Sequence, residues 1–408
     1  MTVLRDRQIV LGVTGSIACY KAADLASKLV QQGARVDVVM TESAQRFVTP
    51  FTFRALTGRP VFTDMFQPVT DMAEEHVEVA RRADLVVIAP ASATTIARLA
   101  HGLADDFLAL TVLATKAPVL IAPAMDSNMW EAAATQANIE ILRARRVAIV
   151  GPASGRLASG RMGLGRMAEV GDIVGAATVE LAKRGDLAGR RIVVSAGGTR
   201  EPIDPVRYIS NHSTGKMGFA LAEAARDRGA DVTLITTTRA LPLPYGVRAV
   251  DVATVADMRE AVLAACAGAD SLIMAAAVSD FRPAHVAGEK IKKGEGGMVL
   301  HLVQNEDFFH EVPESVIKVA FAAETRDVIA NARLKPLSHG NLDLICANDI
   351  SAPDSGFAVD TNRVTILDSE GGAEELPLMS KYEVAQRILD RVVGLLSPAA
   401  GSGRRGRK

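Results

Sequence analysis

Residues 9–41 read IVLGVTGSIACYKAADLASKLVQQGARVDVVMT, and this stretch decides the fold class. Ile9–Val13 is an apolar run of strand length, and Val36–Met40 is a second one. Between them, Ser16 is placed to cap a helix that Gly33 ends. A buried strand, a helix and another buried strand form the unit from which parallel sheets are built.

The same pattern continues through the first half of the chain and starts again in the second half. Gly33–Thr41 (GARVDVVMT) and Gly229–Thr237 (GADVTLITT) are similar, and each follows a strand, a Gly-containing loop and a helix. Val364–Leu367 and Glu374–Leu378 predict a small hairpin at the sheet edge. Further buried strands are predicted at Leu85–Ala89, Val119–Ala122, Val147–Val150, Arg191–Ser195, Val232–Thr236, Ser271–Ala275, Val316–Ala320 and Leu342–Ala347, and helices at Thr214–Arg228, Val255–Ala267, Asp327–Leu334 and Lys381–Leu395.

We therefore expect an α/β protein with two doubly wound, mostly parallel sheets of the Rossmann or flavodoxin-like kind, the second with a small antiparallel edge. Gly and charged residues interrupt two apolar patterns at Lys183–Ala188. This places the first domain at residues 1–186 and the second at 187–397. Residues 398–408 read as a disordered basic tail, for which a solvated end is favoured over a nucleic-acid contact.

Composition excludes several classes of protein. Lys and Arg number 46 against 47 Asp and Glu, and this net charge of −1 argues against a nucleic-acid-binding surface over the whole protein. Apolar residues make up 49% of the chain, which argues against global disorder. Cys19, Cys266 and Cys346 are too far apart for a disulfide framework or a CxxC metal site. With no signal peptide and no apolar run of about 18 residues, we expect a cytoplasmic protein with no membrane partner.

The turn after the first strand is a candidate phosphate site. Gly15 permits close approach to the backbone, and the free N–H groups that follow it attract a phosphate. No GxGxxG motif is present, so a mononucleotide such as FMN fits better than a dinucleotide. Pro90–Thr95 (PASATT) and Pro123–Trp130 (PAMDSNMW) follow two other strands, at the edge where open sheets bind ligands. Each of these two loops alone is typical of an ordinary turn. Together with the turn at Gly15 and Ser16, they favour a ligand-binding site.

His76 lies at the start of a predicted helix, in DMAEEHVEVARRAD. This context is typical of a surface histidine, and the spacing alone favours that interpretation. Histidine is also the usual general base at neutral pH, so a catalytic role stays open.

Long motifs in both halves resemble known enzyme families. In the first half, GSIACYK, PASATT, HGLADDFL, PAMDSNMW and GLGRMAE resemble the FMN-dependent cysteine decarboxylases. In the second half, SAGGTREPIDPVRYISNHSTGKMG, MAAAVSDFRP and EKIKK resemble phosphopantothenate–cysteine ligases. Their order and fusion, over about residues 7 to 396, are similar to the bifunctional phosphopantothenoylcysteine decarboxylase/phosphopantothenate–cysteine ligases of coenzyme A synthesis.

For the first half, the resemblance implies that FMN oxidises the thiol of the cysteine moiety to a thioaldehyde, which then accepts the electrons of the breaking C–C bond. It implies that His76 is the base, that Asp126 and Ser159 occupy catalytic positions, and that Gly163, Gly165, Arg166 and Met167 belong with Ser159 to a substrate flap. The residues it assigns to FMN are Gly15, Ser16, Ile17, Thr41, Ser43, Ala91, Ser92, Ala93, Thr94 and Met125.

Two positions depart from the family's pattern. The family has an Asn that binds the substrate carboxylate where this chain has Asp126, and a Cys that protonates the intermediate where it has Ser159. A hydroxyl is far less acidic than a thiol, and an ionised Asp126 would repel a carboxylate. One hypothesis is that this half decarboxylates its substrate, returns the hydride poorly and releases an enethiol. The other is that another group, such as a protonated Asp126, replaces the thiol. Cys19 is not expected to be that group, because its position is typical of a small buried packing residue.

For the second half, the resemblance implies that CTP activates 4'-phosphopantothenate as an acyl-cytidylate, which the cysteine amine attacks. Lys290 matches the catalytic lysine, Asn211 the residue that holds the acyl-cytidylate carbonyl, and Arg207 a residue that assists its turnover. Mg²⁺ is expected with the CTP phosphates, and no residue of the chain is assigned to the metal. The residues matched to CTP binding are Gly198, Ser213, Met274, Ala275, Ala276, Asp280, Lys290, Asp307, Phe308, Phe321 and Lys335.

Departures in the second half are smaller. Asn305-Glu306-Asp307 replaces the common Asn-Pro-Asp, and Gly340 stands near the place of a second lysine, for which His339 is a candidate substitute. The resemblance also implies a homo-oligomer, with trimeric flavin domains, dimeric ligase domains and a dodecamer if both contacts persist. A flavin-binding regulatory protein is the competing class of function, against which His76 and the ligase motifs count.

Overall fold

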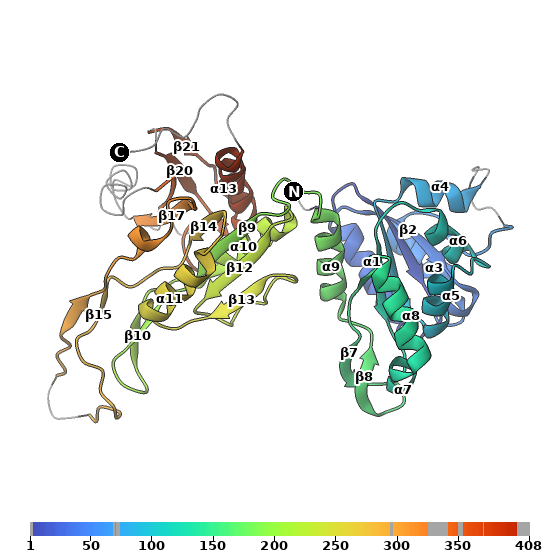
Figure 1. The fold of residues 1–408 in the computed structure, drawn as a ribbon, viewed down its shortest axis with the longest axis horizontal. Helices are drawn as coiled ribbons and strands as arrows, with labels where there is room; N and C mark the ends of the chain where they lie inside the picture. Colours follow the sequence, from blue (N-terminus) through green and yellow to red (C-terminus); the bar gives the residue numbers. More distant parts are fainter. Residues whose placement is uncertain are drawn as a thin grey trace. The chain divides into compact units, whose positions relative to one another are not determined.

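The computed structural model describes residues 3–67, 70, 74–293, 297–324, 342–349, 354–369 and 371–397 (Figure 1). The chain divides into two compact units, Met1–Lys183 and Arg184–Lys408, and each is described separately. The basic tail, Lys335, His339, Gly340 and the predicted helix Asp327–Leu334 lie outside the described residues. Among the helices of the described part, none is long and apolar enough to cross a membrane.

A parallel six-stranded sheet forms the centre of the first unit, in the order β3-β2-β1-β4-β5-β6. The chain builds outward from β1 in one direction and then from β4 in the other, so β1 and β4 are neighbours at the point where the strand order reverses. In such sheets the crevice at the carboxyl ends of these two strands is the usual ligand site. The strands are β1 (Gln8–Val13), β2 (Arg35–Met40), β3 (Val61–Phe62), β4 (Leu85–Ala91), β5 (Val119–Pro123) and β6 (Ala148–Ile149).

Helices cover both faces of this sheet, which makes it doubly wound. Ile9 and Leu11 of β1 belong to the apolar cluster under α1, α3 and α9, whereas Val10 packs with α4, α5, α6 and α8 on the opposite face. This alternation explains the apolar run at the start of the chain, because Ile9, Val10, Leu11 and Val13 each pack into a core on one face or the other. The helices are α1 (Cys19–Gln31), α2 (Glu42–Gln45), α3 (Pro50–Thr57), α4 (Glu75–Arg82), α5 (Ala93–His101), α6 (Phe107–Ala114), α7 (Ser127–Glu131), α8 (Ala133–Ala144) and α9 (Val170–Ala182).

The second unit repeats the design with a longer, mixed sheet, in the order β13-β12-β9-β14-β17-β18-β20-β21. Strands β13 to β18 in that order are parallel, whereas β20 and β21 run antiparallel at the edge, which confirms the predicted hairpin. The strand order reverses between β9 and β14. The strands are β9 (Arg191–Ala196), β12 (Asp231–Thr236), β13 (Arg248–Asp251), β14 (Ser271–Met274), β17 (Ile317–Glu324), β18 (Leu344–Asp349), β20 (Val364–Asp368) and β21 (Ala373–Glu375).

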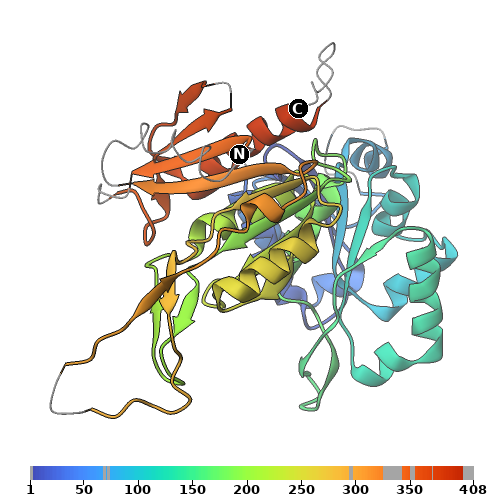
Figure 2. The same ribbon diagram turned by 60° about the vertical axis from the view of Figure 1, so that its left-hand side comes forward.

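Two helices, α10 (Lys216–Asp227) and α13 (Lys381–Leu396), cover one face of the second sheet, and α11 (Val255–Cys266) covers the other. Two small antiparallel pairs, β10 (Arg200–Pro202) with β11 (Tyr208–Ser210) and β15 (Phe281–Pro283) with β16 (Leu302–Gln304), extend from the sheet side by side (Figures 1 and 2). The remaining elements are β19 (Thr361–Asn362), β22 (Met379–Ser380), the short helix η1 (Phe309–Glu311), and, in the first unit, the hairpin of β7 (Ala153–Arg156) and β8 (Met162–Arg166).

The predicted α/β class and the strand–helix–strand unit are confirmed, but the start of the first helix was wrong. Ser16 does not cap α1, which begins at Cys19 with Ala18 as a cap that makes no side-chain hydrogen bond. The chain turns after β1 first, and the Ser16 Oγ accepts a hydrogen bond from the Ala18 N–H at 3.3 Å. The extra turn leaves backbone N–H groups of Gly15–Ile17 outside the helix, which matters for the site.

Candidate active sites

A cavity of about 630 Å³ opens at the carboxyl edge of the first sheet. The segments after β1, β4 and β5 form its floor, and the β7–β8 hairpin forms a further wall. This is the place that the strand order indicates for a ligand. The cavity is lined by Gly15, Ser16, Ile17, Ala18, Tyr20, Lys21, Ser92, Ala93, Ala124, Met125, Asp126, Met129, Arg156, Leu157, Ala158, Ser159, Gly165, Arg166 and Met167.

The floor of this cavity fits a phosphate group. Within the described part of the chain, the backbone N–H groups of Gly15, Ser16 and Ile17 have no hydrogen-bond partner. A Cβ on Gly15 would stand 2.5 Å from the Cβ of Ser43, so only glycine allows the turn to pack this closely. Three free amides in a tight turn before a helix are the usual cradle of a phosphate, and the predicted FMN position agrees with this geometry.

The β7–β8 hairpin is held to the cavity by close backbone contacts. The Met125 N–H donates to the Gly165 carbonyl at 2.9 Å. A Cβ on Gly165 would stand 2.2 Å from the Met125 carbonyl oxygen, and a Cβ on Gly163 would stand 2.2 Å from the Ser127 Oγ. Gly165 is therefore required for the hairpin to pack against the loop after β5, whereas a side chain at Gly163 would displace the Ser127 hydroxyl.

Asp126 and Ser159 meet at the mouth of this cavity. The Ser159 Oγ donates to the Asp126 Oδ2 at 2.9 Å, and the Asn128 N–H donates to Oδ1 at 3.1 Å. The backbone N–H of Asn128, the Ser159 hydroxyl and the nearby positive charge of Arg161 hold the pKa of the Asp126 carboxyl below its usual value. Asp126 is thus an anion near neutral pH. The interpretation of Asp126 as a protonated substitute for the family's thiol is not supported.

Several predicted residues lie outside the lining of the cavity. Thr41 accepts a hydrogen bond from the Ala44 N–H at 3.3 Å and caps α2. Cys19 is fully buried and donates to the Thr14 carbonyl, and burial raises the pKa of its thiol, so it is a packing residue as expected. Ser43, Ala91 and Thr94 are also absent from the lining, although each adjoins a residue that the site uses.

His76 does not line this cavity either. It is the second residue of α4, and its ring packs edge-on against the Phe107 ring, with 6.1 Å between centroids. Because α4 leads back into β4, its first turn lies toward the carboxyl edge of the sheet. His76 is half-buried at the correct edge but outside the cavity that holds Asp126 and Ser159.

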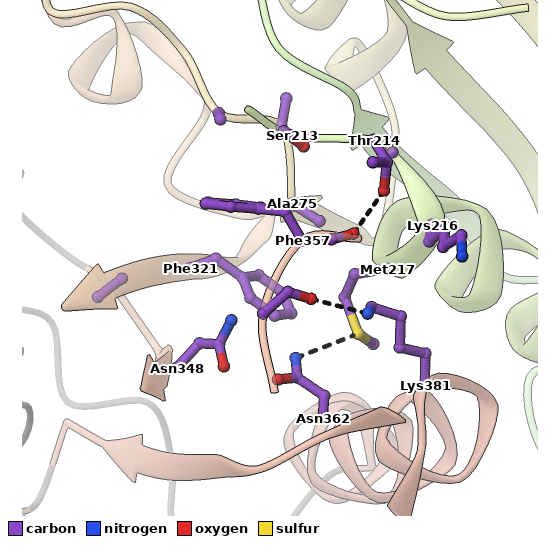
Figure 3. A pocket seen from close by; sticks show the side chains of 15 residues that line it. Ser213, Thr214, Lys216, Met217, Ala275, Phe321, Asn348, Phe357, Asn362 and Lys381 are labelled. Carbon is purple, nitrogen blue, oxygen red and sulfur yellow. Dashed lines mark hydrogen bonds between the residues drawn. The ribbon is translucent and has the colours of Figure 1, made fainter. Parts of the chain in front are cut away.

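A second, smaller cavity lies in the other unit, between the ends of β14, β17 and β18 and the start of α10 (Figure 3). Its volume of about 90 Å³ encloses only part of a nucleotide. In Figure 3, Phe321 and Asn348 lie on the sheet side, opposite the start of α10. The lining comprises Ser213, Thr214, Gly215, Lys216, Met217, Ala275, Ala276, Ala277, Phe321, Ala322, Asn348, Gly356, Phe357, Asn362 and Lys381.

A loop of residues 354–362 forms one wall of this cavity and is held by side chains from two helices. The buried Lys381 ammonium, at the first position of α13, donates to the carbonyls of Gly356 at 2.8 Å, Thr361 at 3.2 Å and Val359. At the start of α10, the Thr214 Oγ1 donates to the Phe357 carbonyl at 2.6 Å, and the Lys216 Nζ donates to Ala358 and Asp360. Burial lowers the pKa of Lys381 to about 8.

Sequence comparisons agree with the two-unit architecture. Residues 2–181 match the family model "Flavoprotein", and residues 187–396 match "DNA/pantothenate metabolism flavoprotein C-terminal domain". The Coenzyme A biosynthesis bifunctional protein CoaBC of Bacillus subtilis is 47% identical over 399 residues, which cover 96% of this chain and 98% of that protein. The chain belongs to the coenzyme A biosynthesis bifunctional protein family. It is an enzyme that combines ligase and FMN-dependent decarboxylase activities.

Two further similarities fall in the same family. CoaBC of Escherichia coli is 45% identical over 399 residues, which cover 96% of this chain and 97% of that protein. The crystal structure of the C-terminal domain of CoaBC is 38% identical with a TM-score of 0.44, and covers 52% of this chain and 98% of that one.

Within this family framework, only part of the predicted nucleotide site is gathered in the second cavity. Ser213, Ala275, Ala276 and Phe321 line it. Asn211 and Gly198 lie at its rim, because the Asn211 Nδ2 donates to the Ala277 carbonyl at 3.0 Å and Gly198 pairs with Ala277. The remaining described residues of the prediction do not line the cavity: Met274, Arg207, Asp280, Lys290, Asp307 and Phe308, of which Phe308 is buried in the cluster with α11.

The bifunctional enzyme also carries site residues that the motifs did not indicate. Lys381, Asn348 and Asn362 reach the second cavity from segments whose sequences look like ordinary strand ends and a helix cap. In the first cavity, Arg156 and Lys21 each contribute a positive charge, and the Lys21 Nζ lies 3.4 Å from the Glu169 Oε2. Among the described residues, no cluster of three or more His, Cys, Asp or Glu side chains could hold a metal ion.

Proposed function

We propose that residues 187–397 ligate cysteine to 4'-phosphopantothenate with CTP, and that residues 1–186 decarboxylate the product with FMN. The observation that carries this proposal is the position of the two cavities. Each opens at the carboxyl edge of a doubly wound sheet, between segments that follow its parallel strands and the start of a helix. Incubation with CTP, Mg²⁺, cysteine and 4'-phosphopantothenate should release pyrophosphate. A yellow protein that releases none would instead be a flavin-binding regulatory protein.

The N–H groups of Gly15–Ile17 would hold the FMN phosphate, and Ser92, Ala93 and Met125 would line the rest of its site. When bound, FMN supplies the oxidation of the substrate thiol that makes the carboxylate a leaving group. The chain's own residues then orient the substrate between the floor and the β7–β8 hairpin. Arg156 and Lys21 supply positive charge for anionic groups of the ligands.

The Asp126–Ser159 pair favours an enethiol as the product of this half. An ionised Asp126 repels the substrate carboxylate, and this repulsion promotes the loss of CO₂. The same ionised Asp126 has no proton to donate to the intermediate. Ser159 uses its hydroxyl hydrogen on Asp126 and is a far weaker acid than a thiol. Release of an enethiol would leave the carbon that lost CO₂ without a new proton, and dioxygen would have to take up the two electrons that the flavin would receive from the substrate thiol.

Mass analysis of the product under air and under nitrogen tests this second candidate. Release of the enethiol predicts a product two hydrogens lighter than 4'-phosphopantetheine, and turnover that stops without oxygen after one equivalent of flavin is reduced. Full turnover to 4'-phosphopantetheine without oxygen would show that the ordinary reductive half operates.

We infer that His76 acts at the cavity of a neighbouring copy in a trimer. The position of His76 beside Phe107, outside the cavity of its own unit, supports this arrangement. Co-expression of His76→Asn and Gly15→Ala chains should restore decarboxylation that neither variant shows alone, because mixed trimers contain sites with both intact residues. No restoration in mixed oligomers would place His76 in the site of its own chain.

For the ligase, we propose Lys290, Asn211 and Arg207 as the catalytic residues, with Mg²⁺ held by the CTP phosphates and a dimer of this unit. If the trimer and the dimer coexist, a dodecamer follows, which mass photometry of the full chain measures directly. The three cysteines are buried and unpaired, in agreement with the reducing cytoplasm that we propose as the enzyme's location.

A further inference from the structure

The turn between β10 and β11 is bonded to the loop that carries Lys290. Asp204 in this turn has a side chain with no exposed surface. Its Oδ2 accepts from the Ile291 N–H at 3.1 Å, and the Arg207 Nη2 donates to the Ile291 carbonyl at 2.7 Å. Ile291 is therefore bonded on both sides of its backbone, and Lys290 is its immediate neighbour in the chain.

A second attachment lies on the other side of the lysine. The Ala287 N–H donates to the Ile203 carbonyl at 3.0 Å. Residues 287 and 291 are thus both tied to the turn of residues 203–207, and the exposed Lys290 projects from the short segment between them. The turn therefore fixes the position of the backbone from which the Lys290 side chain extends.

The two oxygens of Asp204 have separate tasks. Oδ1 accepts from the N–H groups of Val206 and Arg207, both at 2.8 Å, and so closes the turn. Oδ2 accepts from the Arg207 Nε at 2.9 Å and Nη2 at 2.5 Å, and from the Ile291 N–H. The Arg207 guanidinium and these backbone N–H groups hold the pKa of Asp204 well below its usual range, so the carboxyl is ionised near neutral pH.

We propose that Asp204 is a positioning residue for the ligase reaction, which orients Lys290 toward the nucleotide and couples it to Arg207. The proposal rests on the proposed role of Lys290 as the lysine that faces the triphosphate. The proposal also gives Arg207 a positioning role, because its Nε and Nη2 donate to Asp204 and its Nη2 donates to the Ile291 carbonyl.

Asp204→Asn separates the two tasks of the carboxylate. The amide oxygen can stay at the Oδ1 position and keep the turn closed. The NH₂ group then replaces Oδ2 and faces three donors, so the attachment of Ile291 is lost. Asp251→Asn is a matched control, because Asp251 also forms a two-point ion pair, with Arg239, elsewhere in the same unit.

The experiment measures single-turnover pyrophosphate release from CTP and 4'-phosphopantothenate in the full-length enzyme. We expect Asp204→Asn to slow release about tenfold or more, with little change in the KM for CTP, and Asp251→Asn to behave as wild type. In a Lys290→Gln background, Asp204→Asn should cause a much smaller loss than in the wild type, because its effect passes mainly through the lysine. Thermal unfolding checks that each variant is folded.

The outcomes separate the two claims. Losses that multiply in the double variant, or a normal rate for Asp204→Asn, would overturn the positioning role and leave Lys290 as the catalytic residue. A normal rate for Lys290→Gln would instead overturn the proposed function of Lys290, and the role of Asp204 with it.

Discussion

Ser159 donates a hydrogen bond to Asp126 across the mouth of the flavin-unit cavity, with 2.9 Å between Oγ and Oδ2. The bond joins the tip of the β7–β8 hairpin to the loop after β5. It consumes the hydroxyl hydrogen that protonation of an intermediate would need, and it stabilises the anionic form of Asp126.

Restoring the family's residues at this pair should change the product. Asp126→Asn combined with Ser159→Cys supplies an amide for the substrate carboxylate and a thiol as the proton donor. We expect the ratio of 4'-phosphopantetheine to enethiol to rise about 10²-fold, the low end of the effect of a general acid. Liquid chromatography with mass detection measures this ratio. Ser159→Ala is the control, and it should leave the enethiol as the main product.

Gly15→Ala should remove flavin without unfolding the unit. The new Cβ would stand 2.5 Å from the Ser43 Cβ, so the turn that carries the free amides must shift. We expect the flavin absorbance per polypeptide to fall at least about tenfold, while CTP-dependent ligation stays normal because that unit has its own core. Gly171→Ala is the matched control, since a Cβ there meets nothing within 4 Å and flavin content should not change.

Lys381→Met should weaken CTP binding. The substitution keeps the apolar stem of the side chain but removes the donors to the Gly356, Val359 and Thr361 carbonyls, which frees the loop that walls the nucleotide cavity. We expect the KM for CTP to rise about tenfold, equivalent to about 1.4 kcal/mol. Lys183→Met, which removes an exposed lysine of the other unit, should leave this KM unchanged. An unaltered KM in Lys381→Met would show that the wall forms without the lysine.

The same lysine predicts a pH dependence of stability. Its pKa is about 8 in the folded protein and 10.5 when unperturbed, so between these values the unfolded chain binds the extra proton. The free energy of unfolding therefore rises with pH from about 8 to 10.5 through this lysine, by up to about 1.4 kcal/mol per pH unit, and through this lysine it does not change with pH below about 8. Denaturation of wild type and Lys381→Met across this range measures the difference. A constant difference would contradict the lowered pKa.

Much of the fold could be predicted because its strands are buried on both faces. A strand such as β4 shows this burial as a continuous apolar run, which the sequence displays directly. The error at Ser16 arose because a serine before a helix looks the same whether it caps the helix or begins a separate turn.

The candidate sites could be predicted only in part, because local sequence shows which residues follow a strand but not which distant segments pack against them. Loops such as PASATT and PAMDSNMW follow strand ends, so local sequence already places them at the ligand-binding edge. Lys381 has no such signal, because its neighbours form an ordinary helix cap with Ser380 and Glu383. Its role depends on a loop some twenty residues earlier that folds back over the start of α13.

The sequence by itself determined the α/β class, the strand–helix order of both units and the residues that stand at the strand ends, since these follow from burial periodicity and from motifs that are continuous in the chain. Only the tertiary structure decided that Asp126 is an anion held by Ser159, that His76 lies outside the cavity of its own unit, and that Asp204 ties down the loop of Lys290. The physical reason is that charge state and reach depend on hydrogen-bond donors and packing contributed by segments far apart in the chain.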